Sequence, residues 1–218
     1  MTRPLRLATA ALAASAALLL TSCGSDDDNP KADDKIAGAD QGDEKSPSGD
    51  ESAEAGAGVE RPKIEVPSDV TFTFDWAKTG NKTKDAVLAD REQAIQAVDM
   101  AIAEHAPTHK ALRFYYEGDA AANAQKYVQA YVKEQARTTG AYRYYDATVT
   151  ADGDSAGLTY CEDQSKAYDK YLKKDTVDKG PATKNSYVLY AAKLRKNDAG
   201  VWVTTELNAT RGSDTCQP

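Results

Sequence analysis

The 218-residue chain has few of the residues on which common catalytic and metal sites depend. It contains three cysteines, two histidines and two methionines, which leaves little material for a metal site built from His and Cys. It also has no G-x-x-x-x-G-K-[ST] phosphate loop and no G-x-S-x-G nucleophile motif. The sequence therefore indicates no cofactor and does not specify a reaction.

Positive charge is also scarce, with 27 basic against 34 acidic residues and a net charge of −7. Arg3 and Arg6 belong to the N-terminal signal described next, so the exported chain is more negative still. A protein of this charge is poorly suited to nucleic acid or to anionic lipid head groups. We therefore expect no nucleic-acid partner.

An apolar run over residues 7–20 is too short to span a bilayer comfortably. Because it follows two arginines, it has the charged and apolar regions of an export signal. Leu20-Thr21-Ser22-Cys23 then resembles the bacterial lipobox, whose cysteine is acylated and becomes the mature N-terminus. The alternative is an ordinary cleaved signal with a cysteine nearby. We interpret residues 1–22 as a lipoprotein signal peptide and Cys23 as a lipid anchor at the outer face of the cell membrane.

Residues 23–66 are rich in Asp, Glu, Ala, Gly and Ser and show no hydrophobic periodicity. Such a composition cannot bury enough apolar surface to offset the entropy of ordering the chain, so we predict a disordered acidic linker. Its flexible span of roughly 35 Å would keep the domain close to the membrane. The acidic run at residues 26–28 lacks the alternation and the glycine of a calcium loop. Residues 67–218 have the usual size of one domain.

Four segments in the last third have β-strand character. Residues 142–150 and 156–161 are separated by Asp152-Gly153, which favours a tight hairpin turn. Residues 187–194 and 201–207 form a second expected hairpin, after an irregular crossing over residues 162–181. Two hairpins without a long helix between them predict an antiparallel sheet. Residues 70–76 also alternate and form either an edge strand or an extended segment.

Two amphipathic helices are expected before these strands. The first runs from an N-cap at Thr83 to about residue 104, and its apolar stripe is interrupted by Arg91. The second runs from a cap at Asp119 to about Arg137 and ends before Gly140. Both helices should pack their apolar sides on the sheet.

Several segments together resemble secreted actinobacterial lipoproteins of the nuclear transport factor 2-like superfamily. They are Thr79-Gly80 with residues 85–88, Cys161-Glu162-Asp163-Gln164-Ser165, and Gly200-Val201-Trp202-Val203 with Cys216. The resemblance covers residues 70–216 and implies a cone-shaped α+β fold in which helices close the concave face of a curved antiparallel sheet. Members of this superfamily include isomerases, dehydratases and transport adaptors, so the resemblance implies a pocket but no reaction.

Enzymes of that superfamily line the cone with a carboxylate base and with Tyr or His donors. The residues that could line such a pocket here are Tyr142, Tyr144, Asp146, Tyr160, Asp163 and Tyr187. Strand alternation leaves the inward face open, so Tyr145 is an alternative to Tyr144. A tyrosine-rich curved sheet is more often a core with hydroxyl groups at its rim, and Asp163 can instead cap the turn after its strand. We assign no catalytic residue.

The two histidines, His105 and His109, have the spacing of metal ligands on one helix face. Because Pro107 breaks the helix between them, we expect no metal site. The two cysteines that remain without Cys23 form an even pair in an oxidising compartment, so we predict a Cys161–Cys216 disulfide.

Three classes of function follow. We favour a non-catalytic lipoprotein that binds a small apolar ligand or a protein partner in or around the cone. The second class is an isomerase- or dehydratase-like enzyme that uses a carboxylate in the cone. The third is an accessory domain for cell-wall or secretion machinery, which would need an exposed apolar patch.

The anchor can be tested directly. If Cys23 is the acylated N-terminus, Cys23→Ala should release the protein into the medium, because the linker has no other affinity for the membrane. Fractionation of cells followed by immunoblotting measures this. Membrane fractionation of the variant identical to that of the parent would contradict the lipidation of Cys23.

Overall fold

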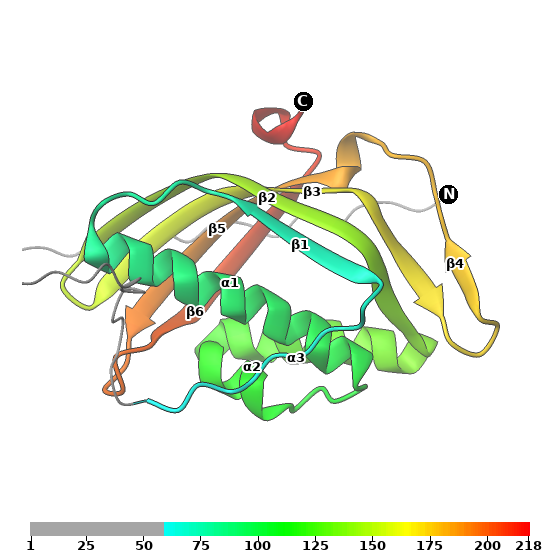
Figure 1. The fold of residues 1–218 in the computed structure, drawn as a ribbon, viewed down its shortest axis with the longest axis horizontal. Coiled ribbons are helices and arrows are strands. Elements are labelled where there is room, and N and C mark those ends of the chain that lie inside the picture. Colours follow the sequence, from blue (N-terminus) through cyan, green and yellow to red (C-terminus); the bar gives the residue numbers. More distant parts are fainter. Residues whose placement is uncertain (1–58) are drawn as a thin grey trace, which may run out of the picture. The chain divides into compact units, whose positions relative to one another are not determined.

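The computed structural model describes residues 59–218, which form three α-helices, six strands and two short 3-10 turns (Figure 1). The expected signal peptide (1–22), Cys23 and the linker as far as residue 58 lie outside the described residues. Within residues 59–218, no helix is long and apolar enough to cross a membrane.

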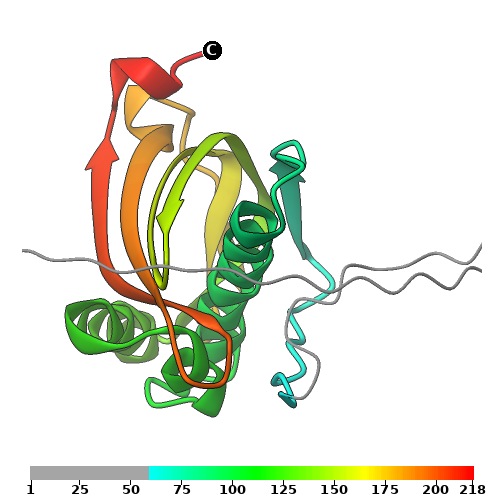
Figure 2. The same ribbon diagram turned by 90° about the vertical axis from the view of Figure 1, so that its left-hand side faces the viewer.

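The helices are α1 (Lys82–Ala103), α2 (Lys110–Tyr115) and α3 (Gly118–Glu134). The strands are β1 (Val70–Asp75), β2 (Ala136–Asp152), β3 (Ser155–Tyr171), β4 (Thr176–Asp178), β5 (Tyr187–Lys196) and β6 (Trp202–Arg211). They form one sheet in the order β1-β2-β3-β5-β6, and β4 pairs with β3. The sheet curves around the helices (Figure 2). The expected fold class, α+β with helices packed on a curved antiparallel sheet, is confirmed.

One strand departs from the antiparallel pattern. β1 runs parallel to β2, with Val70 opposite Gly140 and Asp75 opposite Tyr145. Two parallel strands need a long crossover, and the three helices between β1 and β2 supply it. Residues 70–75 therefore form an edge strand, the first of the two alternatives.

The caps of both long helices differ from the expectation. The side chain of Asn81 caps α1 by accepting hydrogen bonds from the N–H groups of Thr83 and Lys84. Thr83 therefore lies inside the first turn, where its own N–H group is already bonded. α3 has no side-chain cap at its N-terminus, and Asp119 lies in its first turn. The helix ends at Glu134, and its C-cap Gln135, with a φ of 49°, turns the chain directly into β2.

β2 and β3 are longer than their patterns predict. β2 begins at Ala136 and not at residue 142, and β3 continues to Tyr171 through half of the expected irregular crossing. These added halves pair with each other, Ala136 opposite Tyr171. Most residues in the added part of β3 are only partly buried. The apolar alternation that identifies a strand is therefore weak there.

Three register shifts bend the sheet. β3 has one extra residue between Asp163 and Lys166, β2 has one between Tyr145 and Thr148, and β6 has one between Thr204 and Glu206. Such bulges increase local twist and bend the strand that carries the extra residue. Gly140 contributes as well, because its φ is +92° and a Cβ atom there would lie 2.2 Å from the carbonyl oxygen of Lys166.

Helix α1 connects two parts of the core. On one side, Val87 and Ile95 pack in a cluster with aromatic residues of the sheet. On the other, Met100 and Ile102 pack in a second cluster that includes Val128 of α3. Each fully buried aliphatic side chain contributes roughly 1.5–3 kcal/mol. α1 is thus the central element of the domain.

The segment before β1 also packs on α1. Arg61 forms an ion pair with Asp90 of α1, and Ile64 and Val66 pack against the second cluster. These residues belong to the segment 23–66 that the sequence assigns to the linker. The packed region therefore begins before residue 67. The apolar side chains of this segment are too sparse to show periodicity in the sequence, but they still pack against the second cluster.

A disulfide joins Cys161 in β3 to Cys216 in the final 3-10 turn (Asp214–Cys216), with 5.5 Å between the Cα atoms. Both cysteines are almost fully buried. The hydroxyl group of Tyr145 donates a hydrogen bond to the carbonyl oxygen of Cys216. The disulfide therefore fixes the C-terminal tail to the convex side of the sheet.

This disulfide should carry a large part of the stability. It closes a loop with a sequence separation of 55 residues, which stabilises the fold by about 4 kcal/mol in the chain-entropy model. We expect Cys161→Ser/Cys216→Ser to lower the free energy of unfolding in urea by that order, without altering the cavity described below. Titration of the exported protein with a thiol reagent should find neither cysteine free, and two free thiols would contradict the pairing.

Candidate functional site

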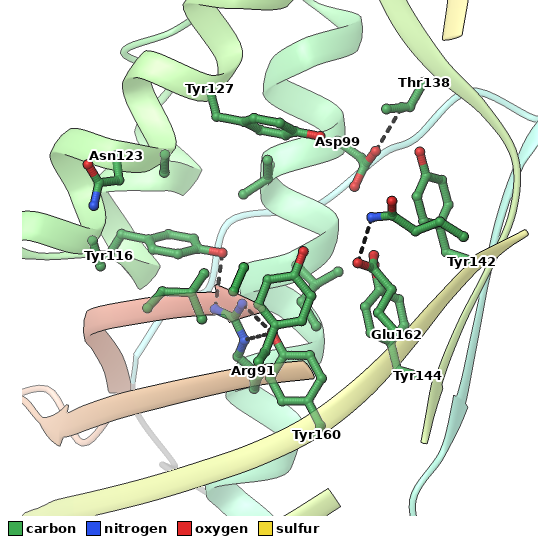
Figure 3. A pocket seen from close by; sticks show the side chains of 18 of the residues that line it. Arg91, Asp99, Tyr116, Asn123, Tyr127, Thr138, Tyr142, Tyr144, Tyr160 and Glu162 are labelled. Carbon is green, nitrogen blue, oxygen red and sulfur yellow. Dashed lines mark hydrogen bonds between the residues drawn. The ribbon is translucent and has the colours of Figure 1, made fainter. Parts of the chain in front are cut away.

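A cavity of about 330 Å³ lies between α1, α3 and the concave face of the sheet. Figure 3 shows its lining side chains pointing toward one another from these elements. Six tyrosines dominate the walls, together with aliphatic side chains from the helices and β6. Four charged or chargeable side chains, Arg91, Asp99, Glu162 and Arg211, also line it, together with Asn123, Thr138 and Gln164.

The tyrosines reach the cavity from every layer of the domain. They are Tyr116 after α2, Tyr127 in α3, Tyr142 and Tyr144 in β2, Tyr160 in β3 and Tyr190 in β5. The rings of Tyr160 and Tyr190 stack with centroids 5.1 Å apart. Tyr127 is 45% exposed, yet its hydroxyl group points toward Asp99 (Figure 3). Stacked rings with polar tips give the cavity an apolar body and hydroxyl groups at fixed positions.

Three of the six pocket residues expected from the sequence line this cavity: Tyr142, Tyr144 and Tyr160. The inward face of β2 is therefore that of Tyr144. Its neighbour Tyr145 lies on the other face, where it bonds Cys216.

The other three expected residues, Asp146, Asp163 and Tyr187, are not among the lining residues. Asp146 lies in the bulge of β2, with a φ of +52°, and is exposed. Asp163 lies opposite Tyr187 in the β3–β5 pair, and opposed residues share one face of a sheet. Glu162 points into the cavity, so its neighbour Asp163 points to the opposite face. Tyr187, which lies opposite Asp163, shares that outer face. A carboxylate oxygen of Asp163 accepts a hydrogen bond from the N–H of Ser165 at 2.7 Å.

Two buried carboxyl groups lie at one end of the cavity. One oxygen of Asp99 accepts a 2.7 Å hydrogen bond from the hydroxyl of Thr138, and no bond to its second oxygen occurs within residues 59–218. Glu162 accepts hydrogen bonds from the hydroxyl of Tyr144 at 2.7 Å and from the amide of Gln164 at 2.6 Å. Glu162 is therefore held at both oxygens, whereas Asp99 keeps one oxygen for the cavity.

Burial shifts the protonation of both groups. It raises the pKa of Asp99 to about 7, against the lowering effect of the Thr138 hydrogen bond and with a further rise from the Glu162 charge. Burial also raises the pKa of Glu162, although its hydrogen bonds oppose the shift. Asp99 can therefore gain or lose a proton near neutral pH, which is the property of a general acid or base.

Arg91 lies at the other end, buried and bonded only to hydroxyl groups. Its guanidinium donates to Tyr160 at 2.7 and 3.1 Å, to Tyr116 at 3.1 Å and to Thr204 at 3.2 Å. The rings of Tyr116 and Tyr160 also lie within cation–π distance of its central carbon. The arginine that interrupts the apolar stripe of α1 is thus a cavity residue.

Sequence reasoning missed the ionisable residues of the cavity. A signal existed for two of them, because Arg91, Ile95 and Asp99 recur every fourth residue on one helical face. Charged residues on an otherwise apolar stripe indicate a buried polar site. No such signal marks Glu162, because the bulge in β3 follows it and disturbs the alternation there.

The two histidines have separate structural roles. His105 bonds the backbone carbonyl of Ala136, and His109 caps α2 by accepting from the N–H of Ala111. No group of three or more His, Cys, Asp or Glu residues within residues 59–218 is arranged to hold a metal ion.

A second hollow of similar volume adjoins the cavity along β3 and β4. Its walls are more polar and include Asp169, Asp178 and Ser165. The two hollows share four residues, Tyr127, Tyr142, Gln164 and Arg211. The two hollows are therefore contiguous beside the arm formed by the ends of β3 and β4.

No protein-family model and no curated protein matches this sequence. Among solved structures, the chain is similar to a candidate dehydratase of the nuclear transport factor 2-like family from Streptomyces avermitilis, with 12% identity, a TM-score of 0.40, and coverage of 59% of this chain and 97% of that chain. It is also similar to a nuclear transport factor 2-like protein with a cystatin-like fold from Novosphingobium aromaticivorans, with 16% identity, a TM-score of 0.37, and coverage of 64% and 96%. At these values the likeness indicates neither an activity nor a ligand.

The Asp99 carboxyl should make stability depend on pH. Its pKa is about 7 in the folded state against an ordinary value of 3.8, so the folded state binds more protons between these values. Its contribution to the free energy of unfolding therefore falls as pH rises from 4 to 7, by on the order of 4 kcal/mol.

Asp99→Asn stays neutral at every pH and should remove this loss. Urea unfolding should find the variant similar to the parent at pH 4 and more stable at pH 8. If the free energies of unfolding of parent and variant differ by the same amount at pH 4 and at pH 8, the raised pKa of Asp99 is contradicted.

Proposed function

We propose that this protein is a membrane-anchored extracytoplasmic lipoprotein whose domain binds a small, largely apolar molecule in the cavity. The preformed cavity of about 330 Å³, with mostly aromatic and aliphatic walls, carries this proposal. Small-molecule sites in proteins have this size, this concave form and a few polar groups at fixed positions. A small molecule that enters such a site exchanges water contact for contact with the tyrosine rings.

The location rests on the N-terminal sequence and on the disulfide. Leu20-Thr21-Ser22-Cys23 supports lipidation after an export signal. The Cys161–Cys216 disulfide supports an oxidising compartment, because such bonds are rare in the cytosol. Both features favour the outer face of the cell membrane.

The surface gives less support to a role in recruiting cell-wall or secretion machinery. Within residues 59–218, the exposed large apolar side chains are Tyr127, Leu172 and Val177. Tyr127 belongs to the cavity, and the other two flank the turn between β3 and β4. Isolated apolar residues of this kind are normal on a protein surface and do not indicate a docking site.

The unbonded oxygen of Asp99 favours a second candidate function, proton transfer to and from a bound ligand. Asp99 has a pKa of about 7 and faces the cavity. A ketone bound with its α-carbon beside Asp99 could exchange an α-hydrogen, with Asp99 as the base.

Blocking the cavity tests the binding function. Ala124 of α3 lines the cavity, whereas Ala122, two residues earlier, is exposed outside it. We expect native mass spectrometry of the full chain purified from its own host to show a bound small molecule. Ala124→Phe should abolish it by filling the space, and Ala122→Phe should retain it. Absence of a bound molecule in the parent, together with no thermal stabilisation by a panel of apolar compounds, would contradict the binding function.

The proton-transfer candidate can be tested with 2-tetralone, a small ketone with exchangeable α-hydrogens. In D₂O, the full chain should accelerate exchange above the buffer rate, with the rate rising as pH passes through about 7 because Asp99 must be ionised to act as the base. Asp99→Asn should return the rate to that of buffer, as followed by NMR. Equal rates with the parent and the variant would exclude Asp99 as the base.

A further inference from the structure

Arg91 is a buried cation without a carboxylate partner. Arg91 is 2% exposed. Within residues 59–218, no carboxylate oxygen lies within 4.0 Å of a guanidinium nitrogen of Arg91, the distance of an ion pair. An arginine side chain stays charged in proteins, so burial cannot neutralise it by deprotonation. The hydroxyl groups and rings around it compensate part of the lost hydration, but they carry no negative charge.

The carboxyl groups of the cavity do not balance this charge. Arg91 and Asp99 lie eight residues apart on α1, which is about 12 Å along the helix axis. Glu162 is held by Tyr144 and Gln164, on the side of the cavity away from Arg91 (Figure 3). The cavity therefore has a cationic end at Arg91 and an acidic end at Asp99 and Glu162.

Two hydrogen-bond donors remain at the cationic end. A guanidinium has five N–H groups, and four of those of Arg91 are used by Tyr160, Tyr116 and Thr204. The fifth lies on the nitrogen that bonds Tyr160 at 2.7 Å. The hydroxyl of Tyr160 accepts two bonds from Arg91, and no acceptor for its own hydrogen occurs within residues 59–218. Two donors about one hydrogen bond apart match the two oxygens of a carboxylate.

We propose that the ligand of this cavity is a monoanionic, otherwise apolar acid whose carboxylate bonds Arg91 and Tyr160. The inference rests on the binding function proposed above and adds the chemical class of the ligand. The carboxylate of the ligand supplies the negative partner that the Arg91 cation lacks. The tyrosine rings enclose the apolar body of the ligand. A hydroxyl or other donor at the far end of the ligand can bond the second oxygen of Asp99.

A matched pair of probes tests the charge. 2-Naphthoate and 2-naphthamide have the same ring and nearly the same size, but only the first is an anion at pH 7. Titration calorimetry would use the full chain in detergent, with protein-free micelles as the blank. We expect 2-naphthoate to bind at least tenfold more tightly than 2-naphthamide. Arg91→Gln should remove this preference, and Arg91→Lys should restore much of it because the charge returns.

Two further arginines serve as controls. Arg143 is exposed and pairs with Asp75 outside the cavity, so Arg143→Gln should keep the preference for the acid. Arg211 lines the cavity where the two hollows meet, and it donates a 2.8 Å hydrogen bond to Gln164. Loss of the preference in Arg211→Gln but not in Arg91→Gln would place the anion at Arg211 and overturn the proposal.

The outcomes separate the inference from the binding function. If the amide binds as tightly as the acid, the cavity binds small molecules but the anionic class is wrong. If neither probe nor any apolar acid binds, the anionic class is wrong, and the binding function fails as well only if the panel of apolar compounds also gives no thermal stabilisation. If Arg91→Gln does not fold, crystals of the parent with 4-iodobenzoate decide, because the iodine position shows which end the carboxylate occupies. Iodine beside Arg91 would overturn the proposal, and iodine at the far end would support it.

Discussion

Side-chain alternation along the strands is the constraint on which the cavity depends. In β2, even-numbered residues such as Tyr142 and Tyr144 face inward before the bulge, and odd-numbered residues such as Val149 face the core after it. β6 changes in the same way, from Thr204 before its bulge to Leu207 after it. Each extra residue both bends the sheet and reverses the inward set. The curvature that makes room for a cavity and the choice of residues that line it therefore have one origin.

Helix α1 then fills most of the space that this curvature creates. It places apolar residues against both clusters and leaves Arg91 and Asp99 on the face that lines the cavity. Burial acts differently on the two charges. The carboxyl of Asp99 can relieve the lost hydration by taking up a proton, whereas the guanidinium cannot and must be compensated by its surroundings. This difference gives the cavity one end whose charge varies near neutral pH and one end whose charge is permanent.

The elements with strong local patterns could be predicted from the sequence. The apolar spacing of α1 and the two hairpins follow from short-range rules, and the pairing of Cys161 with Cys216 follows from the cysteine count. The bulges could not be predicted, because they depend on how the sheet closes over the helices. Without them the inward face stays ambiguous: Tyr144 lines the cavity, whereas Asp146, on the same side by simple alternation, lies in the bulge and does not. Local patterns specify elements, whereas the cavity depends on a register that is settled only in three dimensions.

The polar hollow beside the cavity has a consequence for the rates of ligand exchange. Because Tyr127, Tyr142, Gln164 and Arg211 border both hollows, a molecule that enters the cavity by this route passes the arm of β3 and β4. Residues of the arm that never touch the bound molecule can raise or lower the barrier to passage. By microscopic reversibility, such a barrier slows entry and departure by the same factor. The arm can thus set how long a molecule stays without changing how tightly it is held.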